Sequence, residues 1–269
     1  MAAAGSTGPE VRIEQHDSAV WIWIDRERRR NALNDAVLTQ ITAAAVRAAN
    51  DRSVRAIVLT GTGERAFCAG ADLSAGPAVF TSPDDPTTAF GRLARAARGL
   101  RVPLIARVNG ACVAGGMGLL ALCDLAVAGE HATFSLPEAK VGVFPMQVLV
   151  YLRELLHPRH ISQLCLTGEP IDARTALQIG LVNTVVPATH LDGEVTALVR
   201  KVSRLSPAAV QRGRYAIAAM QSMSFEAALA FAEGQIALAA TTADAREGLA
   251  AFAEHRAARW PGSPGDAAT

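Results

Sequence analysis

The chain of 269 residues has almost no net charge, no long apolar run and no recognisable targeting segment. Its formal net charge is +1, so no general attraction to nucleic acid or to an anionic membrane is expected. No apolar run reaches the roughly 20 residues that cross a bilayer. The first nine residues lack the basic and apolar regions of a signal peptide, so a tail is expected there. These absences favour a cytoplasmic protein without a nucleic-acid or membrane partner.

The chain also lacks the cysteine spacing of a zinc site, because no two cysteines form a Cys-x-x-Cys pair. Reduced, buried thiols are expected instead. His157 and His160 have no cysteine or carboxylate companion nearby, so a helix-start loop is favoured over a metal site. The sequence therefore predicts no metal. The four cysteines are Cys68, Cys112, Cys123 and Cys165.

What the chain does have is the composition of a folded protein with a large core. Hydrophobic residues make up 50% of it and charged residues 19%, which excludes a disordered chain. The runs from Val11 to His16 and from Ala19 to Ile24 predict a hairpin. Asn34 is placed to cap a helix, and a buried strand follows from Ala56 to Thr60. Strands and helices that alternate in this way indicate an α/β architecture with crossover connections.

From Met146 onward the pattern becomes helical, apart from a strand-like run from Val182 to Val186. Ser206 and Pro207 predict the start of an alanine-rich helical region. Its three expected helices run from Pro207 to Met223, Phe225 to Ala240 and Asp244 to Arg259. A loop rich in Pro, Gly, Ser and Thr is expected from Gly76 to Thr88. The predicted organisation is a flexible tail over 1–10, a core over 11–205, a helical oligomerisation region over 206–260 and a flexible tail over 261–269.

Two glycine corners follow strands in this pattern, at Ala69-Gly70-Ala71 and Ala114-Gly115-Gly116. Glycine has no Cβ to cover the backbone N–H groups, and the first turn of a helix has unpaired donors and a positive dipole end. Paired N–H groups from two loops are the usual construction of an oxyanion hole. One corner alone fits a tight packing turn equally well. Two corners followed by an isolated glutamate, Glu138, favour a catalytic site.

A series of short segments, in a fixed order along the chain, carries a family resemblance. In chain order they are Arg28 to Asn34, Ala66 to Leu73, Val108 to Gly110, Ala114 to Gly116, Cys123-Asp124, Pro137-Glu138, Val141-Gly142, Gly180 to Val182, Val185 to Pro187, Glu247-Gly248 and Ala251-Phe252. With these segments the chain resembles the enoyl-CoA hydratase/isomerase family, the crotonases, over nearly its whole length. The resemblance implies a spiral of strand–strand–helix units with a helical C-terminal region that assembles trimers, often paired into hexamers. It also implies an acyl-CoA thioester as ligand, with coenzyme A as part of the substrate and no separate cofactor.

The resemblance assigns roles to individual residues. The N–H groups of Ala71 and Gly115 would hold the thioester oxygen, and Glu138 would be the acid/base group. The hydratases of the family use a second glutamate, and Gly118 occupies its position. The segment from Val141 to Phe144 is expected to raise the pKa of Glu138 by desolvation. Further residues match positions that line the CoA site: Arg30, Ala32, Ala69, Asp72 and Leu73.

A single carboxylate favours double-bond isomerisation, because one base can remove a proton and return it at another carbon. The alternatives are an enoyl-CoA hydratase that works without the second glutamate, or a non-catalytic acyl-CoA binder. If Glu138 instead has a purely structural role, we expect it to cap a turn or to pair with Lys140. Met146 replaces the aspartate nucleophile of the dehalogenase branch, which argues against that chemistry. Three C-terminal side chains would reach CoA phosphates or form a solvated helix face: His255, Arg256 and Arg259.

Overall fold

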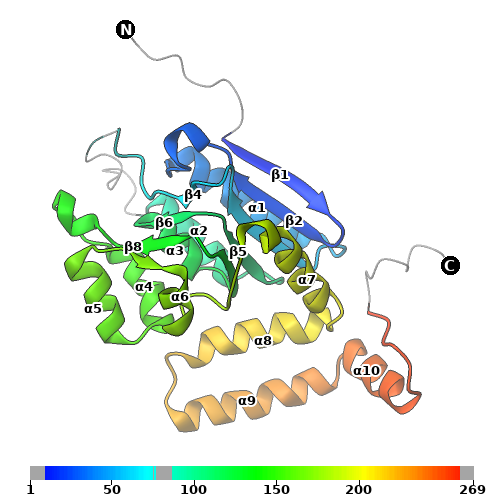
Figure 1. Cartoon of the computed structure of the whole chain (residues 1–269). Coiled ribbons are helices and arrows are strands. Elements are labelled where there is room, and N and C mark those ends of the chain that lie inside the picture. Colours follow the sequence, from blue (N-terminus) through cyan, green and yellow to red (C-terminus); the bar gives the residue numbers. More distant parts are fainter. Residues whose placement is uncertain (1–9, 75, 77–86, 261–269) are drawn as a thin grey trace.

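The computed structural model describes residues 10–74, 76 and 87–260, and Figure 1 shows two sheets surrounded by helices. The larger sheet has the strand order β1-β2-β3-β5-β7-β10, and the smaller has β4-β6-β8-β9. The larger sheet consists of β1 (Val11–His16), β2 (Ala19–Ile24), β3 (Ala56–Gly61), β5 (Leu104–Val108), β7 (Leu125–Gly129) and β10 (Thr184–Val186). The smaller consists of β4 (Ala66–Cys68), β6 (Ala111–Val113), β8 (Thr133–Ser135) and β9 (Ile171–Asp172).

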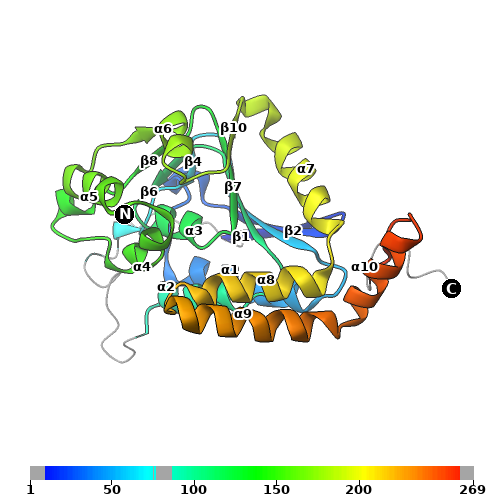
Figure 2. The same cartoon turned by 90° about the horizontal axis from the view of Figure 1, so that it is seen from below.

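Helices cover both faces of the larger sheet, as the continuous apolar runs of its strands require. Strands β2, β3, β5, β7 and β10 pair in parallel, and β1 pairs with β2 in the predicted antiparallel hairpin. Because successive side chains point to opposite faces, Ile57 and Leu59 pack toward α1 (Asp35–Asn50) and α2 (Ala89–Arg98). Val58 faces the other way, in the cluster that α7 (Leu191–Ser203) covers (Figure 2).

The two sheets are joined by a repeated connection, in which a strand of the larger sheet passes directly into a strand of the smaller one. This occurs at β3–β4, β5–β6 and β7–β8, and a helix follows each pair. Asn109 turns the chain between β5 and β6, and its side chain donates to the Gly63 carbonyl over 2.6 Å. Gly110 follows because a Cβ there would lie 2.5 Å from the Arg65 carbonyl carbon. The expected spiral of strand–strand–helix units is confirmed.

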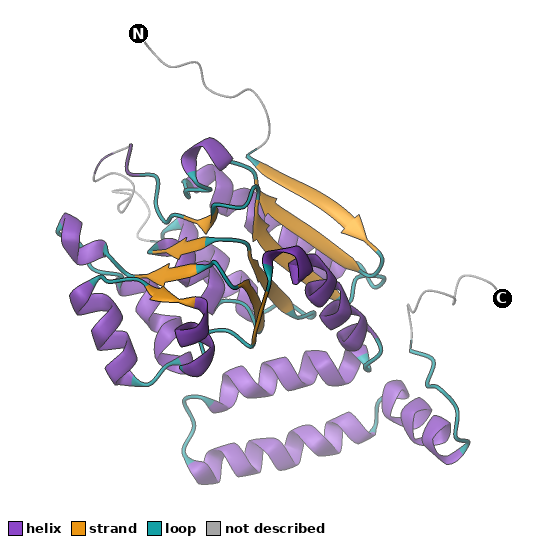
Figure 3. Cartoon of the chain, in the orientation of Figure 1, coloured by secondary structure: helices purple, strands orange, loops and turns teal. Residues whose placement is uncertain are grey.

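The helices begin where the sequence places caps. Asn34 accepts a hydrogen bond from the Val37 N–H over 2.8 Å and so starts α1, and Ser206 caps α8 in the same way. Figure 3 shows how helices enclose the strands. The remaining helices are α3 (Gly115–Ala121), α4 (Met146–Leu155), α5 (Pro158–Thr167), α6 (Ala173–Gln178), α8 (Pro207–Met220), α9 (Phe225–Ala240) and α10 (Ala243–Ala253). Single 3-10 turns occupy η1 (Glu27–Arg29), η3 (Glu138–Val141) and η4 (Ala188–His190).

Several predicted boundaries were wrong by a few residues. Helix α8 ends at Met220, before the predicted Met223, and α10 ends at Ala253 instead of Arg259. His255 adopts a left-handed backbone with φ 54°, and Arg256 is held back against Glu247, so the helix stops there. The strand predicted from Val182 covers only Thr184–Val186. The predicted loop from Gly76 to Thr88 and the two predicted tails lie almost wholly outside the described residues.

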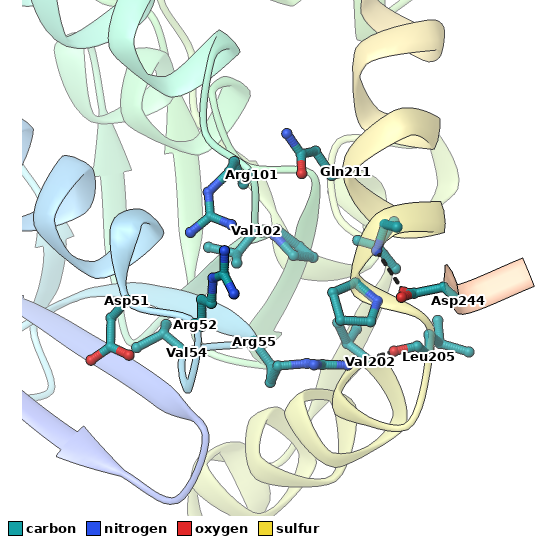
Figure 4. Close-up of a pocket in the computed structure, with 14 residues that line it drawn as sticks. Asp51, Arg52, Val54, Arg55, Arg101, Val102, Val202, Leu205, Gln211 and Asp244 are labelled. Atoms are coloured by element: carbon teal, nitrogen blue, oxygen red, sulfur yellow. Dashed lines mark hydrogen bonds between the residues drawn. The ribbon is translucent and has the colours of Figure 1, made fainter. Parts of the chain in front are cut away.

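Helices α8, α9 and α10 extend away from the two sheets, with α8 and α9 side by side (Figures 1 and 2). The junction encloses a cavity of about 310 Å³, shown in Figure 4. Its charged groups bind the chain itself: the buried Arg55 donates to the Leu205 carbonyl over 2.6 Å. Asp244 accepts hydrogen bonds from the Ser206 hydroxyl and the Ala208 N–H. This cavity therefore serves the attachment of the C-terminal helices.

Within residues 10–74, 76 and 87–260, no helix combines the length and the apolar character needed to cross a membrane. The same residues contain no group of three His, Cys, Asp or Glu side chains placed to hold a metal ion. His157 caps α5 by accepting from the Arg159 N–H, which is the helix-start role that the sequence favoured. The four cysteines are buried and free of disulfides, as expected.

Candidate active site

A larger cavity of about 650 Å³ is lined by residues of the smaller sheet, of α1, α2, α3 and α4 and of the turn η3, and its lining is mostly apolar. Both glycine corners and Glu138 contribute to its wall, although they come from separate strand–strand–helix units. The topology therefore brings together the three features that the sequence singled out. The apolar lining residues include Leu33, Leu38, Leu73, Phe90, Val113, Val141, Val143, Phe144, Met146 and Val148.

The two glycine corners pack directly against each other. A Cβ placed on Gly70 would lie 3.2 Å from the Gly115 nitrogen and 2.7 Å from the Ala114 Cβ. A Cβ placed on Gly115 would lie 3.7 Å from the Ala71 nitrogen. Gly70 also has φ +89°, a conformation that other residues adopt only with strain. Glycine is thus required at Gly70, and the close packing places the Ala71 and Gly115 nitrogens near each other.

Both of these N–H groups are available to a ligand. Ala71 forms a parallel bridge with Leu33, in which the Leu33 N–H donates to the Gly70 carbonyl and the Asp72 N–H donates to the Leu33 carbonyl, each over 2.7 Å. In such a bridge the N–H of Ala71 itself points to the opposite side. Gly115 is the first residue of α3, so its N–H is one of the helix's unpaired donors. Among the described residues neither N–H donates a hydrogen bond.

The corner before α3 carries backbone strain. Ala114 has φ 53° and ψ −119°, a region that a residue with a Cβ enters only at a cost. Its N–H donates to the Ser135 carbonyl over 3.0 Å, which anchors it to β8. Gly116 then allows close approach, since a Cβ there would lie 3.0 Å from the Cys68 Cβ. The strained corner is held by both neighbouring strands of the smaller sheet, and it aims the first turn of α3 at the cavity.

Glu138 begins the 3-10 turn η3 and is half-buried in the cavity wall. Its Oε2 is buried and forms no hydrogen bond with any described residue. Burial raises the pKa of Glu138 above its ordinary value, as expected from its apolar surroundings. Lys140 is not its partner, because Lys140 Nζ lies 2.9 Å from Glu169 Oε1. The alternative of a Glu138–Lys140 ion pair is therefore wrong, and the carboxylate keeps an oxygen free to take a proton.

The residues expected at the CoA site separate into two groups. Ala69 and Leu73 line the cavity. Ala32 and Asp72 lie outside its lining and are joined through Arg26. Arg30 is exposed, has φ 49° and does not line the cavity either.

The contacts of His255, Arg256 and Arg259 favour a solvated helix face over a role in binding CoA phosphates. Arg256 bonds Glu247 and Glu254, and the Arg259 N–H donates to Glu247. Hydrogen bonds from Arg256 and from the Arg259 N–H hold the pKa of Glu247 at about 2. His255 is exposed at the end of α10. These groups stabilise the end of the helix.

Gly118 lies one helical turn after Gly115, and the space beside it is filled by an aromatic ring. A Cβ placed on Gly118 would lie 2.6 Å from Phe90 Cζ and 3.1 Å from Val148 Cγ2. Phe90, on α2, is buried and lines the cavity. Sequence reasoning did not find Phe90, because only the tertiary packing of α2 against α3 brings it to this position. The bare glycine was the one local signal that something else fills the site.

The fold and this pocket define an α/β protein in which two adjacent glycine corners and a half-buried glutamate line one cavity. The family model described as "Enoyl-CoA hydratase/isomerase" matches residues 14–263, and the chain belongs to this family. The "2,3-dehydroadipyl-CoA hydratase" of Escherichia coli strain K12 is 34% identical over 82% of this chain and 86% of the relative. The "Short-chain-enoyl-CoA hydratase" of Clostridium acetobutylicum is 32% identical over 82% of this chain and 85% of its own.

Solved structures agree with this assignment. The enoyl-CoA hydratase of Mycobacterium smegmatis superposes with a TM-score of 0.87 at 34% identity, covering 94% of this chain and 99% of the other. The enoyl-CoA hydratase of Bacillus anthracis has a TM-score of 0.86 at 29% identity, covering 94% of this chain and 100% of the other. The crotonase fold expected from the sequence is therefore confirmed, and the chain is an acyl-CoA-processing enzyme of this family.

Proposed function

We propose that this enzyme converts a 3-enoyl-CoA into its 2-enoyl isomer, with Glu138 as the single acid/base group. The observation that carries the proposal is the state of the carboxylates around the cavity. Among the described lining residues these are Asp35 and Glu138. Asp35 is exposed in the first turn of α1, whereas Glu138 has a buried, unpartnered oxygen and a raised pKa. The second acid expected in a hydratase is replaced by Gly118, and Phe90 fills its space.

The mechanism needs only groups that face the cavity. The thioester oxygen accepts hydrogen bonds from the Ala71 and Gly115 N–H groups. Glu138 removes a proton from C2, so that the C2–H electron pair becomes part of an enolate extended over the C3–C4 double bond. The protonated Glu138 then returns its proton to C4, which leaves the double bond between C2 and C3. Donors fixed before the reaction stabilise the charge that develops on oxygen, and a raised pKa brings Glu138 closer to neutral pH.

Hydration is the second candidate, because the relatives named above carry hydratase names. In that reaction Glu138 would have to activate water without a second carboxylate. The third possibility is an acyl-CoA binder without turnover. The test is to measure, on one preparation, the rate at which a 3-enoyl-CoA is isomerised and the rate at which a 2-enoyl-CoA is hydrated. Faster isomerisation supports the proposal; efficient hydration without isomerisation contradicts it, and no turnover on either ester favours the binder.

We also propose that the chain forms a homotrimer, or a hexamer of two trimers, through its C-terminal helices. Large apolar side chains are exposed on these helices, among them Ile217 at 66%, Phe225 at 76% and Phe252 at 81%. Large apolar side chains exposed to this extent on neighbouring helices support an association site there. Sedimentation of the intact chain tests this assignment, and a monomer at micromolar concentration would contradict it.

A further inference from the structure

The packing of Phe90 against Gly118 is closer than any other side chain at residue 118 would allow. The Cζ and Cε2 atoms of Phe90 lie 2.6 Å and 2.9 Å from the position of a Gly118 Cβ. Real Cβ atoms do not approach other atoms so closely, so even alanine at Gly118 would push the ring away. The Phe90 ring therefore fills the volume that a side chain at residue 118 would need, and it packs directly against the backbone of α3.

The ring is held in place by both walls of the cavity. Thr88 caps α2 by accepting from the Gly91 N–H over 3.0 Å. The Gln147 amide on α4 donates to the same Thr88 hydroxyl over 2.6 Å. This link joins the start of α2 to the start of α4, which also supplies Val148 beside the ring. The position of Phe90 is thus set by α2, α3 and α4 together.

The ring also lies close to the reacting centre. Gly118 follows the oxyanion donor Gly115 by three residues in α3, so both face the same side of the helix. Phe90 lines the same cavity as Glu138. An acyl chain whose thioester oxygen is bound at Gly115 would therefore extend along a wall that includes the Phe90 ring.

The described lining of the cavity offers a charged acyl group one cation, which already has a carboxylate partner. Among the described lining residues the one lysine or arginine is Lys140, and it is paired with Glu169. A carboxylate at the far end of the acyl chain would lose its hydration here without gaining an unpaired cation among the described lining residues, which is costly.

We propose that Phe90 is a specificity-determining residue, whose ring limits the cavity to short, uncharged acyl chains and keeps water out of the space beside Gly118. This inference rests on the proposed acyl-CoA site but not on the direction of the reaction. Removing the ring opens room for further methylene groups, each worth about fourfold in affinity when buried. Adding a Cβ at Gly118 has the opposite effect, because it drives the ring into the cavity.

The test measures dissociation constants for saturated straight-chain acyl-CoA esters of increasing length, by calorimetry on the full chain. Phe90→Ala should shift the optimum to longer chains, raising the affinity for the longest ester relative to the shortest by at least ~10-fold. Gly118→Ala should shift it to shorter chains. Leu93→Ala is the matched control, because Leu93 is a buried residue one turn further along α2 that does not line the cavity. It should leave the length profile unchanged.

Opposite shifts in Phe90→Ala and Gly118→Ala support the inference, since a general loss of stability would not produce them. Identical profiles in the wild type and both variants overturn it. Where Phe90→Ala fails to fold, Phe90→Leu and Gly118→Ala carry the same comparison. In the wild type, an ester with a terminal carboxylate should bind at least ~10-fold more weakly than its uncharged counterpart of equal length. Equal affinity for the two esters overturns the inference that the cavity selects uncharged acyl chains. Because these experiments measure binding, their results can be interpreted even if the enzyme does not catalyse the proposed isomerisation.

Discussion

The guanidinium of Arg26 binds the carboxylate of Asp72, the residue that follows Ala71 in the first glycine corner. Arg26 Nη2 lies 2.8 Å from Asp72 Oδ2, and Nη1 donates to the Ala32 carbonyl over 2.5 Å. Its Nε lies 2.7 Å from Glu10. Burial opposes ionisation of Asp72, but hydrogen bonds from Ser74 and Arg26 outweigh it and hold its pKa well below the ordinary range. One side chain therefore joins the start of β1 to both segments of the Leu33–Ala71 bridge.

We expect Arg26→Ala to lower kcat by at least ~10-fold, because a small displacement of the Ala71 N–H weakens transition-state stabilisation. The dissociation constant of a saturated acyl-CoA should change much less. Arg29→Ala is the control, since Arg29 binds the same carboxylate but is half exposed, and exposed pairs contribute about 0–1 kcal/mol. Steady-state kinetics beside calorimetric binding separate the two effects. A loss of binding with an unchanged kcat would contradict this positioning role.

Removing the N–H of Gly115 should test the oxyanion corner without disrupting α3. Gly115 is the first residue of the helix, a position that proline commonly takes because the missing N–H makes no hydrogen bond within the helix. We expect Gly115→Pro to lower kcat by about 10²–10³ while circular dichroism shows an intact fold. Gly115→Ala keeps the donor, and its Cβ would lie 3.3 Å from the flexible end of Leu33 and in ordinary van der Waals contact with Gly70 Cα and the Ala71 nitrogen. That variant should retain most of the activity, and equal losses in both would remove the Gly115 N–H from the mechanism.

Placing a glutamate at Gly118 should not by itself create a hydratase. The Phe90 ring occupies the required space, so the single substitution overpacks the site, which typically costs about 1–3 kcal/mol. In the double variant Gly118→Glu with Phe90→Ala the carboxylate has room. We expect measurable hydration of a 2-enoyl-CoA in the double variant and none above the wild-type level in either single variant. Additive rates in this cycle would show that the two residues act independently.

Local chemistry was sufficient to predict the helix caps, the hairpin and the glycine corners. Asn34 caps α1 because a short polar side chain before an apolar helix satisfies the first N–H groups, and this is visible in the sequence. The roles of Phe90 and Arg26 were not visible. Phe90 meets Gly118, and Arg26 meets Asp72, only after the spiral has closed. Nothing in the residues next to either one marks these contacts.

The early ends of α8 and α10 show a second limit of sequence reasoning. Neither Met220 nor Ala253 is followed directly by glycine or proline in the sequence, so no signal for the end of the helix is visible at either position. The end of α10 depends on Glu247 capturing Arg256 and the Arg259 N–H, a choice among several possible ion pairs. Helix starts carry a cap residue with a fixed geometry, whereas helix ends without glycine depend on such contacts.

Deleting the chain from Ser206 onward should yield aggregates or an unstable monomer. The deletion removes the apolar faces proposed for assembly, and it also removes Asp244, which lines the junction cavity with Arg55. Asp244→Ala is the milder test: it leaves the Ala208 N–H and the Ser206 hydroxyl without their acceptor, which costs about 1–3 kcal/mol. Denaturant unfolding and sedimentation measure both effects. A well-behaved monomer with full acyl-CoA affinity from the truncated chain would contradict the assembly proposal.

Glu138→Gln should abolish isomerisation and at the same time stabilise the fold at neutral pH. The amide cannot accept the proton from C2, so turnover should fall by at least ~10², while the affinity for a saturated acyl-CoA stays nearly the same. The stability effect follows from the raised pKa of Glu138. A carboxyl with a raised pKa in the folded state is most favourable to folding below its unfolded pKa, and that contribution is lost as the pH rises through the folded pKa.

The wild type should therefore lose stability relative to Glu138→Gln as the pH increases from acid to neutral, and the two should converge in acid. Over the same interval the isomerisation rate of the wild type should rise, because the ionised form is the base. Urea unfolding at a series of pH values measures the first trend, and initial rates across the same buffers measure the second. Glu169→Gln is the control, since Glu169 is an exposed carboxylate that does not line the cavity, although its partner Lys140 does. A Glu138→Gln protein as active as the wild type would contradict the acid/base role of Glu138. A stability equal to that of the wild type at every pH would contradict its proposed contribution to the pH dependence of folding.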